Sequence, residues 1–244
     1  MRPSIPDVHI TDAQDTELAV YRALPGQAVL GLIFGLLSPV ALIDPMLWAI
    51  PLLGVVFSGW ALRRIKNNAP AMTGRKMALV GLAFSLLLAA AAPADWSVYR
   101  RMVRNEAEQF SALWFRYITQ DEPQKAYQLT VTPQTRQPLD DRLWAFYKNA
   151  PRIRQELESY VKQPLVRTLL ALGPKARVRF YQTSGQTREN NNDQVGLLYA
   201  VTYEEAGESK SFFVLVRLER RKLTSGEAGW RILGADGGVK PEGW

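Results

Sequence analysis

The sequence predicts a transmembrane α-helical anchor followed by an α+β domain, with helices packed on a curved four-stranded antiparallel sheet. Three observations lead to this fold class. Apolar residues dominate between residues 28 and 94. Beyond residue 95 charges are frequent, and apolar residues recur first at helical and then at strand spacing. We therefore divide the chain into a polar tail (1–24), a membrane domain (25–94) and a soluble domain (95–244).

The composition removes several kinds of site. The chain has no cysteine and one histidine, His9. Thiolate nucleophiles, sulfur-ligated metals and His-rich metal sites are therefore excluded, and we expect no cofactor and no metal. His9 lies in the polar tail beside Asp7 and Asp12, where a solvated side chain is the simplest interpretation.

The net charge of +7 does not by itself indicate nucleic acid. Five basic residues lie between the second and third apolar blocks, and the region 95–244 has 23 basic and 18 acidic residues. The preference for Lys and Arg on the cytoplasmic side explains the first group without a polyanion. These topology-determining residues are Arg63, Arg64, Lys66, Arg75 and Lys76.

The apolar region is too long for one span. As one helix its first part would measure about 51 Å, against about 30 Å for a hydrocarbon core. Asp44-Pro45 marks a break, because proline cannot continue a helix. We predict three short helices at about 25–43, 45–62 and 77–92, with Asp44 at the tip of a hairpin. Pro39 and Pro51 are expected to kink the first two, and the third is expected to end before Pro93, with a short joint to the next helix.

Small residues recur four apart in each predicted span. The pairs are Gly31 with Gly35, Gly54 with Ser58, and Gly81 with Ser85. Such pairs allow membrane helices to approach closely. They predict packing among the three helices, or dimerisation of the chain through Gly31 and Gly35, and glycine is also simply common in membrane helices.

The charge of the loops predicts the orientation. Five basic residues at 63–76 outnumber the three that follow the third span, Arg100, Arg101 and Arg104. The positive-inside rule therefore places the loop in the cytoplasm and the C-terminal domain outside it. We expect a multi-pass protein of the cell membrane, with the lipid bilayer as a partner and a protein partner or a homo-oligomer as further ones.

The membrane region resembles a known family. The blocks AVLGLIFGLLS, PLLGVVFSGWALRRIK and TGRKMALVGLAFSLLL are similar to the membrane domain of unknown function 4190, with its Ala-Leu-Arg-Arg-type and Gly-Arg-x-x-Ala-x-x-Gly motifs. The second motif would be Gly74, Arg75, Ala78 and Gly81. The resemblance covers about residues 27–92 and implies a membrane domain without known catalytic residues.

The C-terminal region reads as helices followed by a meander. Apolar stripes predict helices over about 103–118, 124–129, 143–147 and 153–161, the third capped by Asp140 or Asp141. Pro164 interrupts the fourth stripe, and the apolar run 165–172 follows it. Alternation predicts strands around 178–181, 195–203, 212–218 and 230–232. Residues 184–193 and 206–208 have the composition of turns. Four successive strands imply an antiparallel sheet, with the helices on one face.

This order resembles the nuclear-transport-factor-like superfamily, which includes cystatin-like and SnoaL-type domains. The resemblance covers about residues 103–236 and rests on the helix, Asp-x-x-x-Ala-Tyr and meander order, here Asp121, Ala126 and Tyr127. It implies a cone-shaped fold that hosts isomerases, dehydratases and binding modules. A fold of this kind does not determine function.

Candidate chemistry is sparse. Proton transfer in such a cone would use a carboxylate, and the acids available are Asp121, Asp140, Asp141, Glu204 and Glu205. Each lies at a predicted turn, cap or strand end, so we assign no catalytic residue. The candidates for lining a ligand pocket, which would otherwise be plain core, are Tyr181, Tyr199, Tyr203, Phe212 and Trp230. The charge run Arg217–Lys222 is either a solvated strand end or a contact for lipid headgroups.

Two functions follow from these patterns. The leading one is a non-enzymatic membrane-anchored protein whose α+β domain binds a protein, an envelope polymer or a small ligand. The alternative is a membrane-tethered isomerase- or cyclase-like enzyme that uses a carboxylate in the cone. A third, nucleic-acid binding, would need one continuous basic face, and the charge partition does not favour it.

Overall fold

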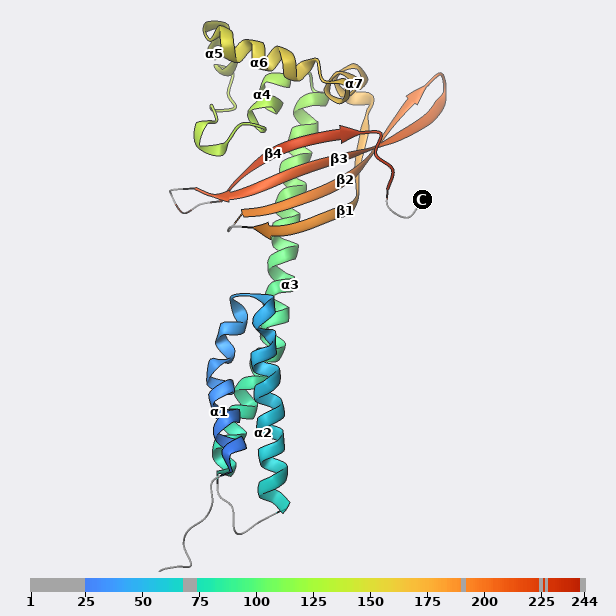
Figure 1. Ribbon diagram of the computed structural model, residues 1–244. Helices are drawn as coiled ribbons and strands as arrows, with labels where there is room; N and C mark the ends of the chain where they lie inside the picture. Colours follow the sequence, from blue (N-terminus) through green and yellow to red (C-terminus); the bar gives the residue numbers. More distant parts are fainter. Residues whose placement is uncertain (1–24, 68–73, 190–191, 224–225, 227, 242–244) are drawn as a thin grey trace, which may run out of the picture. The chain divides into compact units, whose positions relative to one another are not determined.

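The chain forms two compact units, Met1–Val98 and Tyr99–Trp244. Figure 1 shows the computed structural model, which describes residues 25–67, 74–189, 192–223, 226 and 228–241. The predicted tail, with His9, lies outside the described residues. One helix, α3 (Arg75–Thr119), contains the boundary and contributes to both units.

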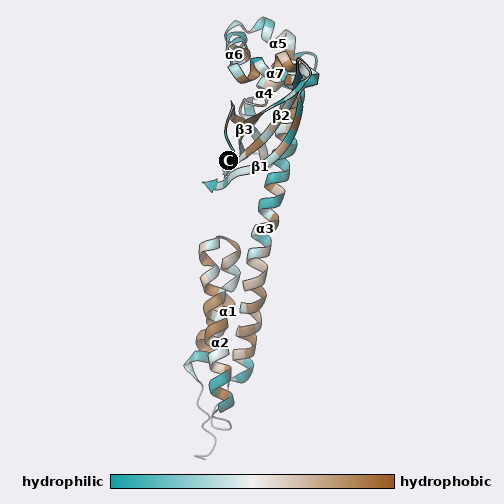
Figure 2. Cartoon of the chain, turned by 90° about the vertical axis from the view of Figure 1, so that its right-hand side faces the viewer, coloured by the Kyte–Doolittle hydropathy of each residue, from teal (hydrophilic) through white to brown (hydrophobic). Residues whose placement is uncertain are grey.

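The first unit is helical. It contains α1 (Gly26–Leu37), the 3-10 turns η2 (Ser38–Leu42) and η3 (Pro45–Trp48), α2 (Ala49–Asn67) and the first half of α3. Two helical stretches, Pro45–Asn67 and Arg75–Thr119, are long and apolar enough to cross a membrane. A shorter apolar helix covers Gly26–Leu42. The hydropathy colouring of Figure 2 shows this apolar character along α1, α2 and the start of α3.

The prolines act differently from the prediction. Pro39 lies at the start of η2, where α1 has ended, and Pro51 lies in the first turn of α2. The N–H groups of a helix's first turn have no acceptor within the helix. Pro51, which lacks an N–H, therefore fits this position without kinking the helix. Pro93 instead lies inside the continuous 45-residue α3, so the predicted end before it and the joint after it are wrong. Alanines precede it as strong helix formers, and the Ser97 hydroxyl donates to the Pro93 carbonyl.

The second helix is also longer than predicted. Because α2 continues to Asn67, Arg63, Arg64 and Lys66 lie on its last turns rather than in a loop. Arg75 and Lys76 form the beginning of α3. Asp44 lies between η2 and η3, and its side chain accepts a hydrogen bond from the Met46 N–H at 2.8 Å.

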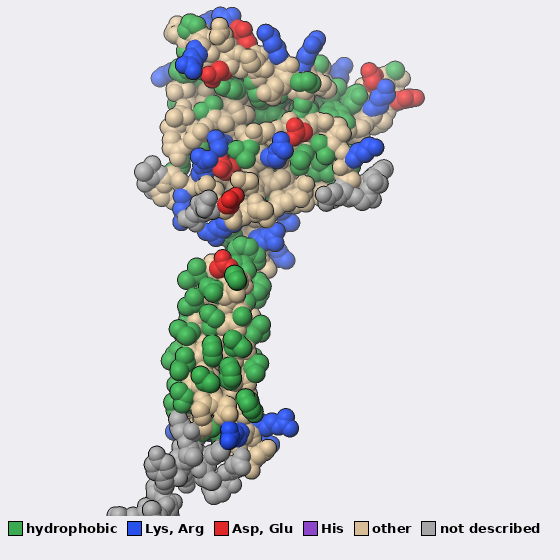
Figure 3. Space-filling model, in the orientation of Figure 1, with side chains coloured by type: hydrophobic (Ala, Val, Ile, Leu, Met, Phe, Trp, Pro, Cys, Tyr) green, Lys and Arg blue, Asp and Glu red, His purple; other side chains and the backbone are tan. Residues whose placement is uncertain are grey.

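In the first unit most large apolar side chains lie on the exposed surface, and small residues predominate in the interior. Of the 23 exposed large hydrophobic residues in the described part of the chain, eighteen lie between Leu30 and Val98. Figure 3 shows these side chains covering the visible face of the helices. Pro51, Ile65 and Leu88 are also buried, but the interior is made mostly of small residues: Ala28, Gly31, Gly35, Ser38, Ala41, Gly54, Ser58, Ala61, Ala78, Gly81 and Ser85.

The second unit combines helices with a four-stranded antiparallel sheet. After α3 come α4 (Pro123–Gln128), the 3-10 turn η4 (Pro133–Thr135), α5 (Leu143–Asn149), α6 (Pro151–Val161), α7 (Pro164–Leu172) and the 3-10 turn η5 (Gly173–Lys175). The strands are β1 (Arg177–Glu189), β2 (Asn192–Glu205), β3 (Glu208–Lys222) and β4 (Ala228–Gly237). They pair in the order β1-β2-β3-β4, which is a meander.

The strands extend beyond their predicted ends. Most of residues 184–193, predicted as a turn, belong to the strands instead, because residues 185–189 of β1 pair with residues 192–196 of β2. The turn from β2 to β3 is confirmed at Ala206 and Gly207, whose φ angles of 53° and 82° are those of a tight hairpin. β1 contains two register shifts, at Tyr181 and Ser184. The predicted cap of α5 is wrong, because Arg142 is the N-cap residue and Asp140 accepts from its N–H.

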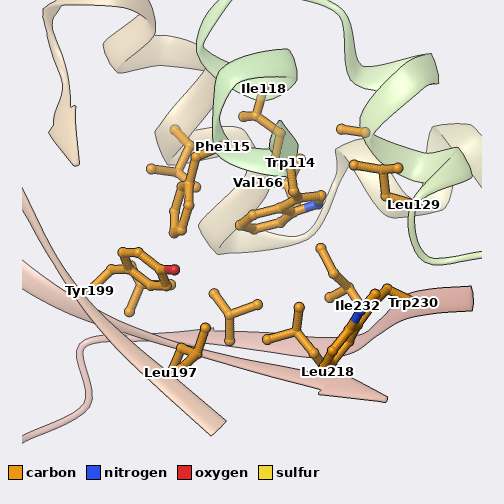
Figure 4. Close-up of a cluster of buried hydrophobic side chains, with 14 of the residues drawn as sticks. Trp114, Phe115, Ile118, Leu129, Val166, Leu197, Tyr199, Leu218, Trp230 and Ile232 are labelled. Carbon is orange, nitrogen blue, oxygen red and sulfur yellow. The ribbon is translucent and has the colours of Figure 1, made fainter. Parts of the chain in front are cut away.

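The core of the second unit lies between the helices and one face of the sheet. Figure 4 shows Trp114, Phe115 and Ile118 of α3 above Leu197, Leu218 and Ile232 of three strands. Polar contacts reinforce this packing where α3 enters the second unit. The Tyr99 hydroxyl donates to Asp193 at 2.6 Å. The Glu106 carboxylate accepts from both Arg220 and Trp230 at 3.0 Å.

Candidate functional site

A cavity of about 650 Å³ opens between α6 and β4 in the second unit. We call it the α6–β4 cavity. Its walls come from α3, α4, α6 and β4, which are brought together only by folding. The lining residues are Trp114, Tyr127, Thr130, Arg152, Gln155, Glu156, Ser159, Tyr160, Gln163, Arg231, Ile232, Leu233, Gly234 and Ala235.

Helix α6 supplies most of the polar wall. Pro151 begins the helix, and Arg152, Gln155, Glu156 and Ser159 follow at spacings of three, one and three residues. Residues so spaced share one side of an α-helix, so all four line the cavity together. Leu157 and Tyr160 are both buried, and Tyr160 also lines the inner end of the cavity. The sequence therefore gives α6 an apolar side for the core and a hydrogen-bonding side for the cavity.

Three aromatic residues form the inner end of the cavity. Trp114 Nε1 donates to the Tyr160 hydroxyl at 2.8 Å. The rings of Tyr127 and Tyr160 are 5.4 Å apart. Burial raises the pKa of Tyr160 above its ordinary value. Burial, together with its hydrogen bond to Glu156 at 2.9 Å, raises the pKa of Tyr127 to about 12. Both phenols therefore remain protonated at neutral pH.

Strand β4 supplies the facing wall. Arg231 Nε donates to Glu219 Oε2 at 2.7 Å, and Arg221 donates to the same oxygen at 2.8 Å. Burial alone would raise the pKa of the Glu219 carboxyl, but the hydrogen bonds and positive charges of these arginines outweigh it and lower the pKa. The register shift beside Arg217 leaves Leu233 unopposed on β4, with 45% of its surface exposed. Such bulges re-aim side chains beside a site.

The arrangement suits recognition of a polar ligand. It presents amides, a hydroxyl, a carboxylate and two guanidinium groups around an aromatic end. Cavities with a few convergent polar groups and an apolar wall are typical ligand sites. Among the described residues, no group of three or more His, Asp and Glu side chains is placed to hold a metal ion.

The five predicted pocket residues do not gather at this cavity. Tyr199 lines a second cavity, of about 510 Å³, between α3 and β1, and its hydroxyl is 2.5 Å from Ser111 Oγ. Tyr203 lines a third cavity near the β2–β3 hairpin and contacts Phe212 edge to face. Phe212 packs against the core.

Tyr181 and Trp230 are placed differently again. Tyr181 is 45% exposed and lies edge to face against Phe213, with ring centroids 5.0 Å apart. Trp230 is buried, and its indole N–H donates to Glu106. These aromatic residues therefore lie in separate places, because the register shift at Tyr181 and the length of the strands spread them over the sheet.

The predicted carboxylates also lie away from the α6–β4 cavity. Asp121 follows α3 in a left-handed conformation with φ of 60°. Asp140 caps the turn before α5, and Glu205 pairs with Lys210 at 2.7 Å. Asp141 and Glu204 are exposed. The carboxylate that does line the cavity, Glu156, was not among the candidates.

The small residues of the first unit meet in pairs. Gly31 lies against Ser58, Gly35 against Gly81, and Gly54 against Ser85. These contacts join α1 to α2, α1 to α3 and α2 to α3. Gly31 and Gly35 are buried within the chain, so they are not available for the dimerisation considered above.

The residues that sequence reasoning missed are the polar side of α6 and Arg231. A signal was present for α6, since Arg152, Gln155, Glu156, Ser159 and Gln163 recur at helical spacing beside an apolar stripe. No sequence pattern pointed to Arg231, because its position at the cavity depends on the pairing between β3 and β4. Comparisons with protein-family models, with curated proteins and with solved structures find no match to this chain.

Proposed function

We propose that this chain is a non-enzymatic, multi-pass membrane protein whose second unit binds a small polar ligand, or the end of a polymer, in the α6–β4 cavity. In this proposal α1, α2 and the first half of α3 span the membrane. The basic residues at the end of α2 and the start of α3 lie in the cytoplasm, and the second unit lies outside it.

The distribution of side chains supports the anchor. Large apolar residues such as Leu36, Leu87 and Val56 are more than half exposed, whereas small residues fill the interior. In water this arrangement would leave most of the apolar surface unburied, while in lipid it costs nothing. An exposed apolar surface of this extent marks a membrane or protein interface.

The observation that carries the binding function is the polar side of α6 facing β4 across a cavity. Most exposed polar residues on a helix are solvated and converge on nothing. Here Arg152, Gln155, Glu156 and Ser159 converge with Arg231 on one volume of about 650 Å³. Volumes of this size hold a drug-sized ligand.

The two resemblances are part of the proposal. A membrane domain similar to the domain of unknown function 4190 would supply the anchor. A domain similar to the nuclear-transport-factor-like superfamily, with its curved sheet, would supply the cavity. Binding is favoured over the enzyme alternative because Glu156 is an exposed carboxylate already bound by Tyr127. General acid–base chemistry uses a group that is tuned by burial and free to reach its substrate.

The orientation can be tested with single cysteines, because the chain has none of its own. Ser209→Cys lies at the exposed β2–β3 hairpin, and Asn67→Cys lies at the end of α2. In right-side-out vesicles a membrane-impermeant maleimide should label Ser209→Cys, and should label Asn67→Cys only after permeabilisation. The reverse pattern would place the second unit in the cytoplasm and overturn this orientation.

The cavity can be tested by filling it. Full-length protein in nanodiscs would be screened by thermal shift against neutral and anionic oligosaccharides and short peptides. Ser159→Trp, inside the cavity, should abolish the shift given by a binding compound. Arg154→Trp, on the solvent side of the same helix, should retain it. If no compound binds, or if both variants bind equally, the cavity is not the site. Mass spectrometry of the bound compound tests the alternative, since turnover would indicate an enzyme.

A further inference from the structure

The two edges of the sheet differ in how they are covered. On β4, the Ile232 N–H donates to the Leu129 carbonyl at 2.9 Å, and Arg136 donates to the Trp230 carbonyl at 2.6 Å. Leu165 lies against Gly237 at the end of the same strand. On β1, apart from the ladder with β2, none of the backbone hydrogen bonds in the described part of the chain involves Arg177–Phe180. Half of the backbone groups there point away from β2. Figure 1 shows β1 at the margin of the sheet.

An apolar groove follows this open edge. It is the cavity of about 510 Å³ between α3 and β1. Val178, Phe180 and Ala176 line it from the side of the strand, and Ala112 and Phe115 line it from the side of the helix. Phe180 is 40% exposed, although it sits beside a core residue, Tyr199. The groove therefore has room for apolar side chains that the chain itself does not supply.

The other face of the same strand segment is basic. Arg177 and Arg179 alternate with Val178 and Phe180, so they point away from the groove. Both are exposed, as is Lys175 before the strand, whereas the exposed Arg116 of α3 lines the groove itself. None of the ion pairs among the described residues uses Lys175, Arg177 or Arg179. Glu108, the acid that lines the groove, is paired with Arg104.

We infer that the edge Arg177–Phe180 receives an extended segment of a partner protein as an added strand. The segment has apolar and acidic residues in alternation. Its apolar side chains enter the groove beside Val178 and Phe180, and its acidic side chains lie beside Arg177 and Arg179. Both the open backbone edge and the alternation of the strand specify this partner.

The register shift at Tyr181 sets the length of the paired segment. The ladder of an added strand is interrupted where the backbone of β1 departs from regular pairing. A regular segment of about four residues spans about 13 Å, so the core of the recognised sequence is short. This site is separate from the α6–β4 cavity, which lies at the opposite edge of the sheet, and it does not depend on the function proposed above.

Fluorescence anisotropy with full-length protein in nanodiscs tests the inference. The probe is a fluorescein-labelled hexapeptide of alternating valine and glutamate. It should bind, and Arg179→Glu should weaken binding about 10-fold through loss of one favourable charge contact and gain of a repulsive one. Arg167→Glu, an exposed position on α7, changes the net charge equally and should leave binding unchanged.

Two altered probes separate the parts of the inference. A peptide with lysine in place of glutamate should bind Arg179→Glu better than the original protein. A peptide N-methylated at alternate residues cannot pair with the edge and should not bind. Hydrogen exchange across β1 and β2 checks that the sheet is intact in Arg179→Glu.

Several outcomes would overturn the inference. They are absence of binding by the acidic peptide, equal losses in Arg179→Glu and Arg167→Glu, and undiminished binding of the N-methylated peptide. Concentration-dependent dimerisation that Arg179→Glu abolishes would show that a second copy occupies the edge instead, and would also overturn it. Peptide binding should persist in Ser159→Trp, so failure at one site is distinguishable from failure at the other.

Discussion

The two units of this chain place their side chains in opposite ways. In the first unit Leu87 is 65% exposed and glycines and serines fill the centre. In the second unit Leu197 and Leu218 are fully buried and charges cover the surface. A helix bundle in water is held by burial of large apolar residues, whereas in lipid that driving force is absent and close contact between backbones replaces it. With the first unit in lipid, as proposed above, burial of a side chain has a different meaning on each side of Val98.

The same substitution should therefore have different effects in the two units. Leu197→Ala, in the core of the sheet, should lower the free energy of unfolding of the second unit by about 2–5 kcal/mol, because it removes buried surface and leaves a cavity. Leu87→Ala should change the stability of the first unit by less than about 0.5 kcal/mol, since both side chains would face lipid. Segment-resolved hydrogen exchange in nanodiscs measures each unit separately. Equal losses would contradict the comparison.

Replacing a buried glycine by a large residue should destabilise the first unit, unlike the replacement of an exposed leucine by alanine. A Cβ added at Gly81 would lie 2.6 Å from the Gly31 carbonyl oxygen, so α1 and α3 would have to separate. Gly81→Leu should destabilise the first unit by about 1–3 kcal/mol, the usual range for overpacking. Gly59→Leu, where nothing lies near the added atom, is the matched control. Crosslinking between cysteines placed on α1 and α3 should fall only in the first variant.

Acid should weaken the second unit. The lowered pKa of Glu219 means that its contribution to stability is present above the ordinary pKa of glutamate and is lost as pH falls through the lowered value. At pH 7 Glu219→Gln should cost about 1–2 kcal/mol, since two charged hydrogen bonds weaken. The difference from the original protein should shrink below about pH 4, as the pH approaches the lowered pKa of Glu219 and its carboxyl becomes protonated. Urea unfolding at the two pH values checks this, and a constant difference would refute it.

The smallest effect is expected at the β2–β3 hairpin, which has no counterpart in the first unit. Ala206 adopts φ of 53°, which alanine tolerates poorly, and Gly207 follows it at 82°. Ala206→Asn creates the preferred pair for this turn and should stabilise the second unit by about 0.5 kcal/mol. Ala206→Val should destabilise it instead, because a β-branched side chain fits this conformation worse. Melting temperatures of the two variants should shift in opposite directions.

The sequence predicted which helices and strands exist more accurately than it predicted where they begin and end. Alternation around Tyr199 and Val214 predicted the strands, because each side of the sheet meets one environment. It did not predict that β1 continues through Ser184 and Gly185, where no apolar residue repeats. Pro93 was assigned to a helix end from its local preference, but the alanines around it and the packing of α3 favour a continuous helix.

The candidate site was less accessible to prediction. The aromatic residues of the strands were visible as candidates, yet pairing places Tyr181, Tyr203 and Trp230 in different surroundings. Glu156 and Arg231 lie 75 positions apart in sequence and meet at one cavity only through the packing of α6 against the edge of β4. The spacing of residues along the chain therefore could not predict that these two side chains line the same cavity.

The two register shifts of β1 have a consequence for the behaviour of many copies of the chain at high concentration. A straight open edge is a template on which identical chains can stack without limit, as in amyloid fibrils. At Tyr181 and Ser184 the edge changes direction before a long ladder can form. The chain can thus expose a few backbone groups and remain resistant to runaway polymerisation.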